Sequence, residues 1–304
     1  MREVDILLAT YNGEKYLAEQ LDSILSQTHT QWRLLIRDDD SSDSTLDIIQ
    51  EYIGRYPSQI ILIQDNEKNL GAYQNFARLL QEASSDYVMF CDQDDVWLET
   101  KIEETLKAMI DNERTDTPLL VHTDLVVVDE KLQTLHPSFV KKMRINVKRD
   151  RFNQLLMRNI ATGCTMMINR PLLDLILPLP EKGVIHDWWI VLVASIYGHI
   201  IYLDRATILY RQHGNNTIGA SQESGWEYIQ EEFDFKTIEL IHTVQQAILL
   251  KQRYEETLPV EKKKTLEIFT NLLENRGYKR KLLQLRYGFL YHNVFKNLGL
   301  MVKS

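Results

Sequence analysis

Residues 4–27, with the sequence VDILLATYNGEKYLAEQLDSILSQ, contain a strand, a turn and a helix in direct succession. The apolar run Val4–Ala9 is typical of a buried strand, and Thr10–Gly13 is typical of a turn. A helix is expected over Glu14–Gln27, because apolar side chains recur there at helical spacing, namely Leu17, Leu21, Ile24 and Leu25. This order of elements indicates an α/β fold.

The same order recurs through the first half of the chain. Strands are predicted at 33–37, 60–64 and 86–91, and helices at 45–56 and 72–83. Alternating strands and helices form a mostly parallel, Rossmann-like sheet that is flanked by helices. We therefore expect ligands to bind at the carboxyl ends of the strands.

The second half of the chain shows a looser pattern. Apolar or strand-like segments occupy 119–128, 161–168, 200–203 and 206–210, and a helix is expected over 187–197. The remaining C-terminal part is helical in pattern, because Gly and Pro are sparse and its charges are spaced for exposed faces. The sequence thus predicts an α/β body followed by a helical C-terminal appendage.

The composition excludes disorder along the whole chain, because 44% of its 304 residues are hydrophobic and only 26% are charged. The formal net charge of −8 argues against nucleic-acid binding as the main task. This charge is unevenly distributed. Residues 276–304 contain seven basic side chains and no acidic one, so their formal charge is +7. Residues 1–275 therefore carry a formal charge of −15.

Cysteine content and hydropathy suggest where the protein works. Cys91 and Cys164 are too few for a disulfide framework, and neither belongs to a CxxC pair. The N-terminus enters a strand without a signal-like region, and no apolar run reaches the length of a membrane span. We therefore expect a cytoplasmic protein without structural zinc, either soluble or peripheral on the inner face of the cell membrane.

The turn after the first strand reads TYNGEKY and matches neither GxGxxG nor GxxxxGK[ST], so dehydrogenase and P-loop chemistry are disfavoured. A nucleotide must then be bound by other residues. Asp38, Asp39 and Asp40 follow the second strand, where a carboxylate can accept a hydrogen bond from a pyrimidine N–H or a ribose hydroxyl. The alternative is a solvated turn whose aspartates cap the next helix.

Asp92-Gln93-Asp94-Asp95 follows the buried-looking strand Tyr-Val-Met-Phe-Cys. Three carboxylates within four residues repel one another unless a cation compensates them. Hard oxygen ligands at the end of a strand suit Mg²⁺ or Mn²⁺ carrying a diphosphate. An acidic turn without a metal is the alternative.

Two further segments carry candidate functional side chains. Asp187 lies at an apparent helix start, where it is either an N-terminal cap or a general base. Trp188 and Trp189 are either a sugar-stacking platform or core residues. His213, in the loop RQHGNN, is either a metal ligand or an ordinary hydrogen-bonded histidine.

Seven ordered motifs over about the first 220 residues resemble glycosyltransferase family 2, the inverting nucleotide-sugar transferases of the GT-A fold. These motifs are ATYNG (9–13), RDDDSSDST (37–45), NLG (69–71) with Asn75, DQDDVW (92–97), ATGC (161–164), HDWW (186–189) and YRQH (210–213). Within the family, the series is most similar to bacterial rhamnosyltransferases of cell-surface polysaccharide synthesis.

The resemblance implies a role for each residue that matches a family motif. The nucleotide-sugar donor is expected to contact Thr10, Tyr11, Asn12, Asp39, Asn69, Gly71, Asp92 and Asp94. A divalent cation, Mn²⁺ or Mg²⁺, is expected on Asp94, Asp95 and His213. Asp187 is expected to be the catalytic base. The sugar or the acceptor is expected to contact Thr162, Gly163, His186, Trp188 and Trp189.

One position departs from the family pattern, because His186 replaces the first residue of the usual acidic pair before the helix. Such a neighbour could alter the pKa of Asp187 or share its proton.

The resemblance also implies a reaction, the inverting, metal-dependent transfer of a sugar to a hydroxyl of a growing cell-surface polysaccharide. If the basic C-terminal tail lies on a membrane, that acceptor is expected to be lipid-linked. The expected sugar is L-rhamnose from dTDP-L-rhamnose. Two alternatives remain open. One is a transferase with a UDP-hexose donor, and the other is a catalytically silent subunit that binds a nucleotide sugar within an assembly complex.

The expected domain organisation follows the motifs. Residues 1–220 form the GT-A catalytic domain, with a nucleotide-binding half at 1–117 and an acceptor-binding half at 118–220. Residues 221–304 form the helical appendage. Its tail carries an apolar stripe flanked by basic residues, made of Leu283, Tyr287, Leu290, Tyr291, Val294, Leu298 and Met301. Such a helix either lies on an anionic membrane or packs against the body or a second subunit.

Overall fold

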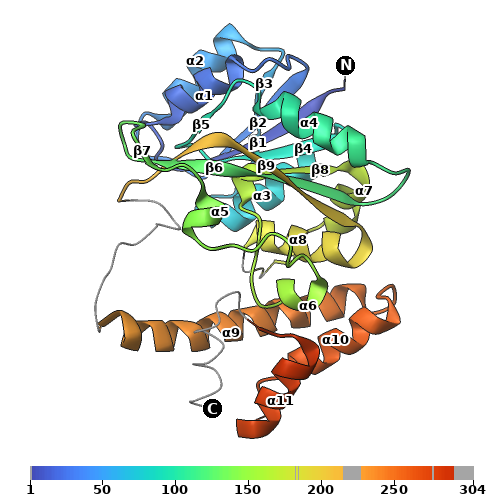
Figure 1. Cartoon of the computed structure of the whole chain (residues 1–304). Helices are drawn as coiled ribbons and strands as arrows, with labels where there is room; N and C mark the ends of the chain where they lie inside the picture. The colour runs from blue at the N-terminus through green and yellow to red at the C-terminus, as the bar shows by residue number, and fades with distance from the viewer. Residues whose placement is uncertain (1, 182, 184, 215–226, 276, 291–304) are drawn as a thin grey trace.

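The computed structural model of the chain describes residues 2–181, 183, 185–214, 227–275 and 277–290. Its centre is a nine-stranded sheet in the order β3-β2-β1-β4-β8-β6-β9-β5, with β7 paired to β6 (Figure 1). The strands of the first half are β1 (Val4–Thr10), β2 (Trp32–Asp38), β3 (Ile60–Leu62) and β4 (Tyr87–Cys91). All three pairings among them are parallel, as the alternation predicted.

Antiparallel pairs enter the sheet in the second half. β8 (Met166–Asn169) lies antiparallel between β4 and β6 (Leu119–Val128). β9 (His199–Arg211) runs parallel to β6, so the two late strands expected from the sequence are one long strand with an irregular register near Thr123 and Asp124. The short β5 (Val96–Trp97) and β7 (Thr134–His136) pair antiparallel to β9 and β6.

Helices cover both faces of the sheet because successive side chains of the strands point to opposite sides. In β1, Ile6 and Leu8 enter the core beneath α1, α2 and α4, whereas Leu7 enters the core shared with α3 and α8. Figure 1 shows these two layers above and below the sheet. The helices are α1 (Leu17–Leu25), α2 (Thr45–Arg55), α3 (Gly71–Glu82), α4 (Lys101–Asn112) and α8 (His186–Tyr197).

Several short elements lie between β7 and α8, where the sequence predicted only the apolar segment 161–168. They are α5 (Phe139–Lys142), α6 (Phe152–Leu155), the 3-10 turn η1 (Gly163–Thr165) and α7 (Arg170–Ile176). The turn η1 and β8 account for most of the predicted apolar run 161–168. Together they carry the chain back across the end of β4.

The C-terminal appendage consists of α9 (Glu227–Tyr254), α10 (Val260–Thr270) and α11 (Gly277–Tyr287), which lie below α8 in Figure 1. Val244, Leu250 and Phe269 are buried in the same core cluster as Trp189 of α8. This continuous core attaches the appendage to the α/β body.

Only part of the predicted apolar stripe of the tail lies within the described residues. Leu283 and Tyr287 are partly buried and pack against the core cluster that α8 and α10 share. Tyr291, Val294, Leu298 and Met301 lie outside the described residues. These two residues of the stripe therefore pack on the protein itself.

Within the described part of the chain, every helix is too short or too polar to span a membrane.

Candidate active site

The predicted site residues gather where β1, β2 and β4 end side by side, as expected for a parallel sheet. Hydrogen bonds join the loop after β1 to the loop after β2. Thr10 Oγ1 donates a hydrogen bond to Asp38 Oδ1 at 2.8 Å, and the Ser41 N–H donates to Asp38 Oδ2 at 2.8 Å. The side chain of Asn12 accepts a hydrogen bond from the Ser42 N–H at 2.8 Å. Thr10 and Asn12 thus connect the two loops at this edge of the sheet.

Asp39 holds the turn that precedes α3. Its Oδ1 accepts hydrogen bonds from the Leu70 N–H at 2.9 Å and from Arg37 Nη1 at 3.2 Å, and its Oδ2 accepts from the Gly71 N–H at 2.8 Å. The turn needs such support because Asn69 and Gly71 have positive φ angles of 54° and 78°. Asp39, Asn69 and Gly71 are therefore neighbours, and Oδ2 has the capacity to accept a second hydrogen bond.

Gln93 joins the first loop to the acidic loop after β4, a role that the sequence did not reveal. Its amide accepts from the Tyr11 N–H and donates to the Tyr11 carbonyl, both at 2.9 Å. A Cβ on Gly13 would lie 2.4 Å from Gln93 Oε1, so a larger residue there would displace the Gln93 amide from Tyr11. The Tyr11 side chain remains 51% exposed, which leaves its ring free to contact a ligand.

Asp94 and His213 meet although 119 residues separate them. His213 Nε2 lies 2.8 Å from Asp94 Oδ2, and both side chains are mostly buried. The His213 ring packs against Tyr16 with 4.9 Å between ring centroids. Arg211, at the end of β9, donates from Nε to the Asp94 carbonyl at 2.9 Å. The structure thus brings together two of the three predicted metal ligands.

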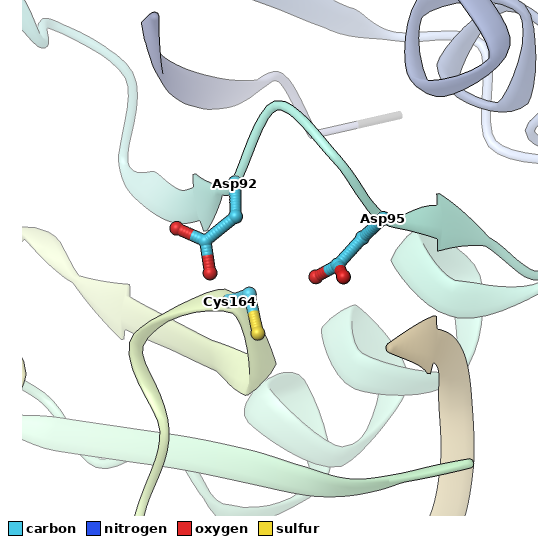
Figure 2. A group of neighbouring side chains, drawn as sticks. All are labelled: Asp92, Asp95 and Cys164. Atoms are coloured by element: carbon cyan, nitrogen blue, oxygen red, sulfur yellow. The ribbon is translucent and has the colours of Figure 1, made fainter. Parts of the chain in front are cut away.

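The third predicted ligand, Asp95, faces Asp92 and Cys164 instead (Figure 2). One potential ligand atom from each of these three residues lies within 4.8 Å of the others. Asp95 is fully buried. Its Oδ1 accepts from the Arg211 N–H at 3.2 Å, whereas its Oδ2 has no hydrogen-bond partner among the described residues.

Asp92, Asp95 and Cys164 form what we call the acidic pocket, and its electrostatics favour a bound cation. Burial, and then the charge of Asp94, raise the pKa of Asp92 to about 7. Burial also raises the pKa of Asp95 well above its usual value. A cation would compensate these charges and satisfy the orphaned Oδ2 of Asp95. The carboxylates and the imidazole of His213 suit Mg²⁺ or Mn²⁺, while the Cys164 thiol is a softer ligand than either prefers.

The amine of Lys101 is buried near this pocket. The sequence did not predict this, because a lysine at the start of a helix is usually exposed to solvent. Lys101 is fully buried, and its Nζ has no hydrogen-bond partner among the described residues. It lies 4.7 Å from the centroid of the Trp97 ring. Burial lowers the pKa of Lys101 to about 8, against the opposing charges of Cys164, Cys91 and Asp95. Its ammonium group therefore supplies fixed positive charge to the acidic pocket.

Asp187, the predicted base, is the second residue of α8 and is buried. Its Oδ2 accepts a hydrogen bond from the Gly163 N–H at 3.1 Å, while its Oδ1 has no partner among the described residues. Burial raises the pKa of this carboxyl to about 7, and the charge of Asp92 adds to the shift. A carboxyl with this pKa and one uncommitted oxygen is suited to accept a proton near neutral pH.

His186 lies beside the base but is surrounded by aromatic rings. Its ring centroid is 4.2 Å from that of Phe76 and 5.5 Å from that of Phe90. Burial lowers the pKa of His186 to about 3, so the imidazole is neutral at physiological pH. Its Nε2 has no hydrogen-bond partner among the described residues, and it would lie 2.9 Å from a Cβ on Gly163. His186 and Gly163 thus pack tightly beside Asp187, next to the half-buried Thr162.

The two tryptophans after the base do not form a sugar-stacking platform. Trp189 is fully buried in the core and packs 6.1 Å from the ring of Tyr254 in α9. Trp188 is 8% exposed, and its Nε1 donates to the Leu155 carbonyl at 2.7 Å. Because their faces are covered by protein, the prediction of sugar contact is wrong for both residues, and the alternative core assignment holds.

Comparison with known proteins connects this site to a family. The family model described as Glycosyl transferase family 2 matches residues 5–176. The dTDP-rhamnosyl transferase RfbG of Shigella flexneri is 31% identical over 225 residues, which cover 70% of this chain and 74% of RfbG. The UDP-Glc:alpha-D-GlcNAc-diphosphoundecaprenol beta-1,3-glucosyltransferase WfgD of Escherichia coli is 30% identical over 172 residues, which cover 56% of this chain and 62% of WfgD.

Solved structures share the fold. TarS of S. aureus, in complex with UDP-GlcNAc, superimposes with a TM-score of 0.56 at 19% identity, covering 92% of this chain and 83% of TarS. The mannosyltransferase PcManGT of Pyrobaculum calidifontis, in complex with GDP-Man and Mn²⁺, has a TM-score of 0.58 at 15% identity, covering 94% of this chain and 72% of PcManGT. The sheet topology is therefore that of the GT-A fold. With the matching family model and the motifs assembled at the strand ends, the chain belongs to glycosyltransferase family 2.

Proposed function

We propose that this protein transfers L-rhamnose from dTDP-L-rhamnose, with inversion, to a hydroxyl of a growing, lipid-linked polysaccharide. The observation that carries the proposal is the buried carboxyl of Asp187, which has one uncommitted oxygen and a pKa of about 7. The charge of Asp92, in the acidic loop at residues 92–95, also raises the pKa of this carboxyl. An inverting transfer needs such a pairing of a base with a region that accommodates a diphosphate.

The donor is proposed to lie along the loops after β1, β2 and β4. Thr10, Tyr11 and Asn12 would border the nucleoside, and the remaining lone pair on Asp39 Oδ2 would accept the N–H of its pyrimidine base. Asn69 and Gly71 would lie beside the same base or its ribose, because Asp39 fixes their turn. Uracil and thymine present the same N–H, so this contact is compatible with either base.

The reaction is proposed to proceed by direct displacement at the anomeric carbon. Asp187 would orient the acceptor hydroxyl and take its proton through Oδ1, while the Gly163 N–H keeps Oδ2 in place. Asp94, Asp95 and His213 would hold a divalent cation together with Asp92. When bound, that cation supplies positive charge to the departing diphosphate.

The names of two relatives support the choice of donor and acceptor. RfbG is described as a dTDP-rhamnosyl transferase, and WfgD is described as acting on a diphosphoundecaprenol-linked sugar. An acceptor of the second kind would place this protein on the cytoplasmic face of a membrane. WfgD and TarS are associated with UDP-linked sugars, so a UDP-hexose is the competing donor.

The decisive variant is Asp187→Asn. It keeps the shape of the side chain but removes the proton acceptor, so we expect donor affinity to remain and turnover to fall by about 10²-fold or more. Asp174→Asn is the matched control, because Asp174 is an exposed acid on α7 with 64% of its side chain accessible. Isothermal titration with the donor and a transfer assay with membrane extract give the two readouts.

Each outcome bears on a separate part of the proposal. Undiminished turnover in Asp187→Asn would rule out this residue as the base. Turnover of UDP-glucose, but not of dTDP-L-rhamnose, would replace the donor and leave the mechanism in place. Donor binding without consumption by the wild-type protein would favour a silent subunit of an assembly complex.

A further inference from the structure

A second cavity lies far from the strand ends that form the candidate active site. Its volume is about 610 Å³, within the usual range for a small-molecule site. It is lined by residues of α4, α6, α8, β9, α10 and α11 and by the segment before α6. The catalytic domain and the C-terminal helices therefore both contribute to its wall.

Four cationic side chains line this cavity, namely Arg114, Arg151, Lys262 and Arg286, and we call it the cationic cavity. Two acidic residues, Asp150 and Glu261, also line it, so its walls carry a positive excess. The four cations form no ion pair with any residue in the described ranges. Their charge is thus not neutralised by protein carboxylates at contact distance.

The charged groups of two of these cations lie over aromatic rings. Lys262 Nζ lies 5.3 Å from the centroid of the Phe152 ring, and the Arg286 guanidinium lies 5.8 Å from that of Tyr287. Lys262 is half-buried, and burial lowers its pKa. An anion in the cavity would offset the cost of burying this ammonium group.

The cationic cavity is separate from the donor site. Ser195, which lines it, lies eight residues along α8 from the proposed base Asp187, or about 12 Å at 1.5 Å per residue. His199 and Ile200 bring it to the first residues of β9, at the opposite end of the strands from the acidic loop. A donor diphosphate bound at the acidic loop cannot occupy it.

We propose that the cationic cavity binds a phosphate-bearing ligand. Three guanidinium groups and one ammonium group offer the forked and point-charge donors that phosphate oxygens accept. The ligand is either a soluble phosphate compound or the headgroup of an anionic lipid, since both present the same oxygens. The inference does not depend on the identity of the transferred sugar.

The test compares two double variants of the full-length protein. Lys262→Gln with Arg286→Gln removes two cavity cations, whereas Lys264→Gln with Lys279→Gln removes two exposed cations on the same helices, outside the cavity lining. Inorganic pyrophosphate is titrated calorimetrically in the presence of a chelator, so that no divalent cation supports binding at the acidic loop. Sedimentation with phosphatidylcholine vesicles, with and without phosphatidylglycerol, is measured in parallel.

We expect the cavity variant to lose pyrophosphate affinity by about tenfold or more relative to wild type, and the control variant to change by less than about threefold. Loss of binding to the anionic vesicles in the cavity variant alone would identify a lipid headgroup as the source. Pyrophosphate binding with no vesicle binding would identify a soluble ligand. If both variants bind both partners like wild type, or if wild type binds neither, the proposal is wrong.

Discussion

The two oxygens of the Asp187 carboxyl lie in different environments, and this difference determines how its reactivity should depend on pH. Burial raises its pKa to about 7, and only the ionised form can take a proton. We therefore expect the rate of transfer at low substrate concentration to fall about tenfold for each pH unit below 7 and to level off above it. A pH–rate profile of kcat/KM measures this. A profile that stays flat down to pH 5 would contradict the raised pKa of Asp187.

Lys101 should weaken cation binding at the acidic pocket, because its buried ammonium group interacts with the same carboxyl that would hold the cation. Replacing Lys101 with Met removes that positive charge at similar volume. We expect the variant to bind Mn²⁺ about threefold to tenfold more tightly at pH 7. Since the pKa of Lys101 is about 8, the difference from wild type should shrink above that pH.

Lys101→Arg is the control for this prediction, since it keeps the positive charge. Titration calorimetry with Mn²⁺ at pH 7 and at pH 9 compares the three proteins. Equal affinities of wild type and Lys101→Met at pH 7 would show that the ammonium group does not act on the cation.

At the level of single residues, the sequence predicted those side chains that belong to contiguous motifs. The aspartates after β2 and β4 could be located because they follow apolar strands, and Asp187 because it lies at the start of a helix. The roles of Gln93 and Lys101 could not be found, because their partners come from other segments of the chain. The tryptophans beside Asp187 were misjudged because a motif does not indicate which face of its helix is buried.

Among the elements, the junction between α8 and β9 has the least tolerance for a larger side chain. A Cβ on Gly198 would lie 1.9 Å from the Pro118 carbonyl oxygen, a backbone atom that cannot move independently. We expect Gly198→Ala to lower the free energy of unfolding by about 1–3 kcal/mol. Urea denaturation followed by circular dichroism measures the change.

Gly54 provides the matched control for Gly198. It lies within α2, and nothing is within 4 Å of a Cβ placed on it. Gly54→Ala should therefore raise the free energy of unfolding by about 0.5–1 kcal/mol, since alanine favours a helix. Similar stability changes in both variants would contradict the steric argument.

The long elements of the first half were predictable because one face or one strand is continuously apolar. The strands at 33–37 and 86–91 correspond to β2 and β4, within one residue at each end. The two-residue β5 and the four-residue α5 were not predictable, since such short elements are defined by pairing and packing with distant segments. The split of β9 into two predicted strands arose from Asp204 and Arg205, which interrupt its apolar pattern.

Across the whole molecule, the C-terminal helices share a core with the α/β body. Phe269 of α10 and Val244 of α9 belong to the same buried cluster as Trp189 and Leu7. We expect the full chain to unfold in a single transition, detected at the same urea concentration by circular dichroism and tryptophan fluorescence. Two separated transitions would show instead that residues 1–220 and 221–304 are independent domains.

A truncated protein gives a second check of this coupling. Removing residues 221–304 would expose the apolar side chains of α8 that now contact the appendage, including Trp189 beside Tyr254. The shortened chain should bind more of a hydrophobic dye and unfold at a lower temperature than the full chain. An unchanged melting temperature would count against a shared core.

The net charge of the molecule does not indicate where its charged sites lie. A net charge of −8 excluded little beyond a general affinity for nucleic acid. The arrangement of charges matters more, because the acidic loop and the cationic cavity lie at opposite ends of α8 and of the neighbouring strands. The cationic cavity was not predictable, since its four cations come from four separate segments of the chain.

The buried thiols have a consequence for how the protein meets oxidants and electrophiles. Cys91 and Cys164 are both free and almost completely inaccessible, and burial raises the pKa of each thiol well above its usual value. Alkylating reagents attack the exposed thiolate, so neither residue is reactive while the fold is closed. Any modification of Cys164 would record a transient opening of the chain around the acidic pocket. The rate of labelling at this position therefore measures how often the structure unfolds locally around the acidic pocket.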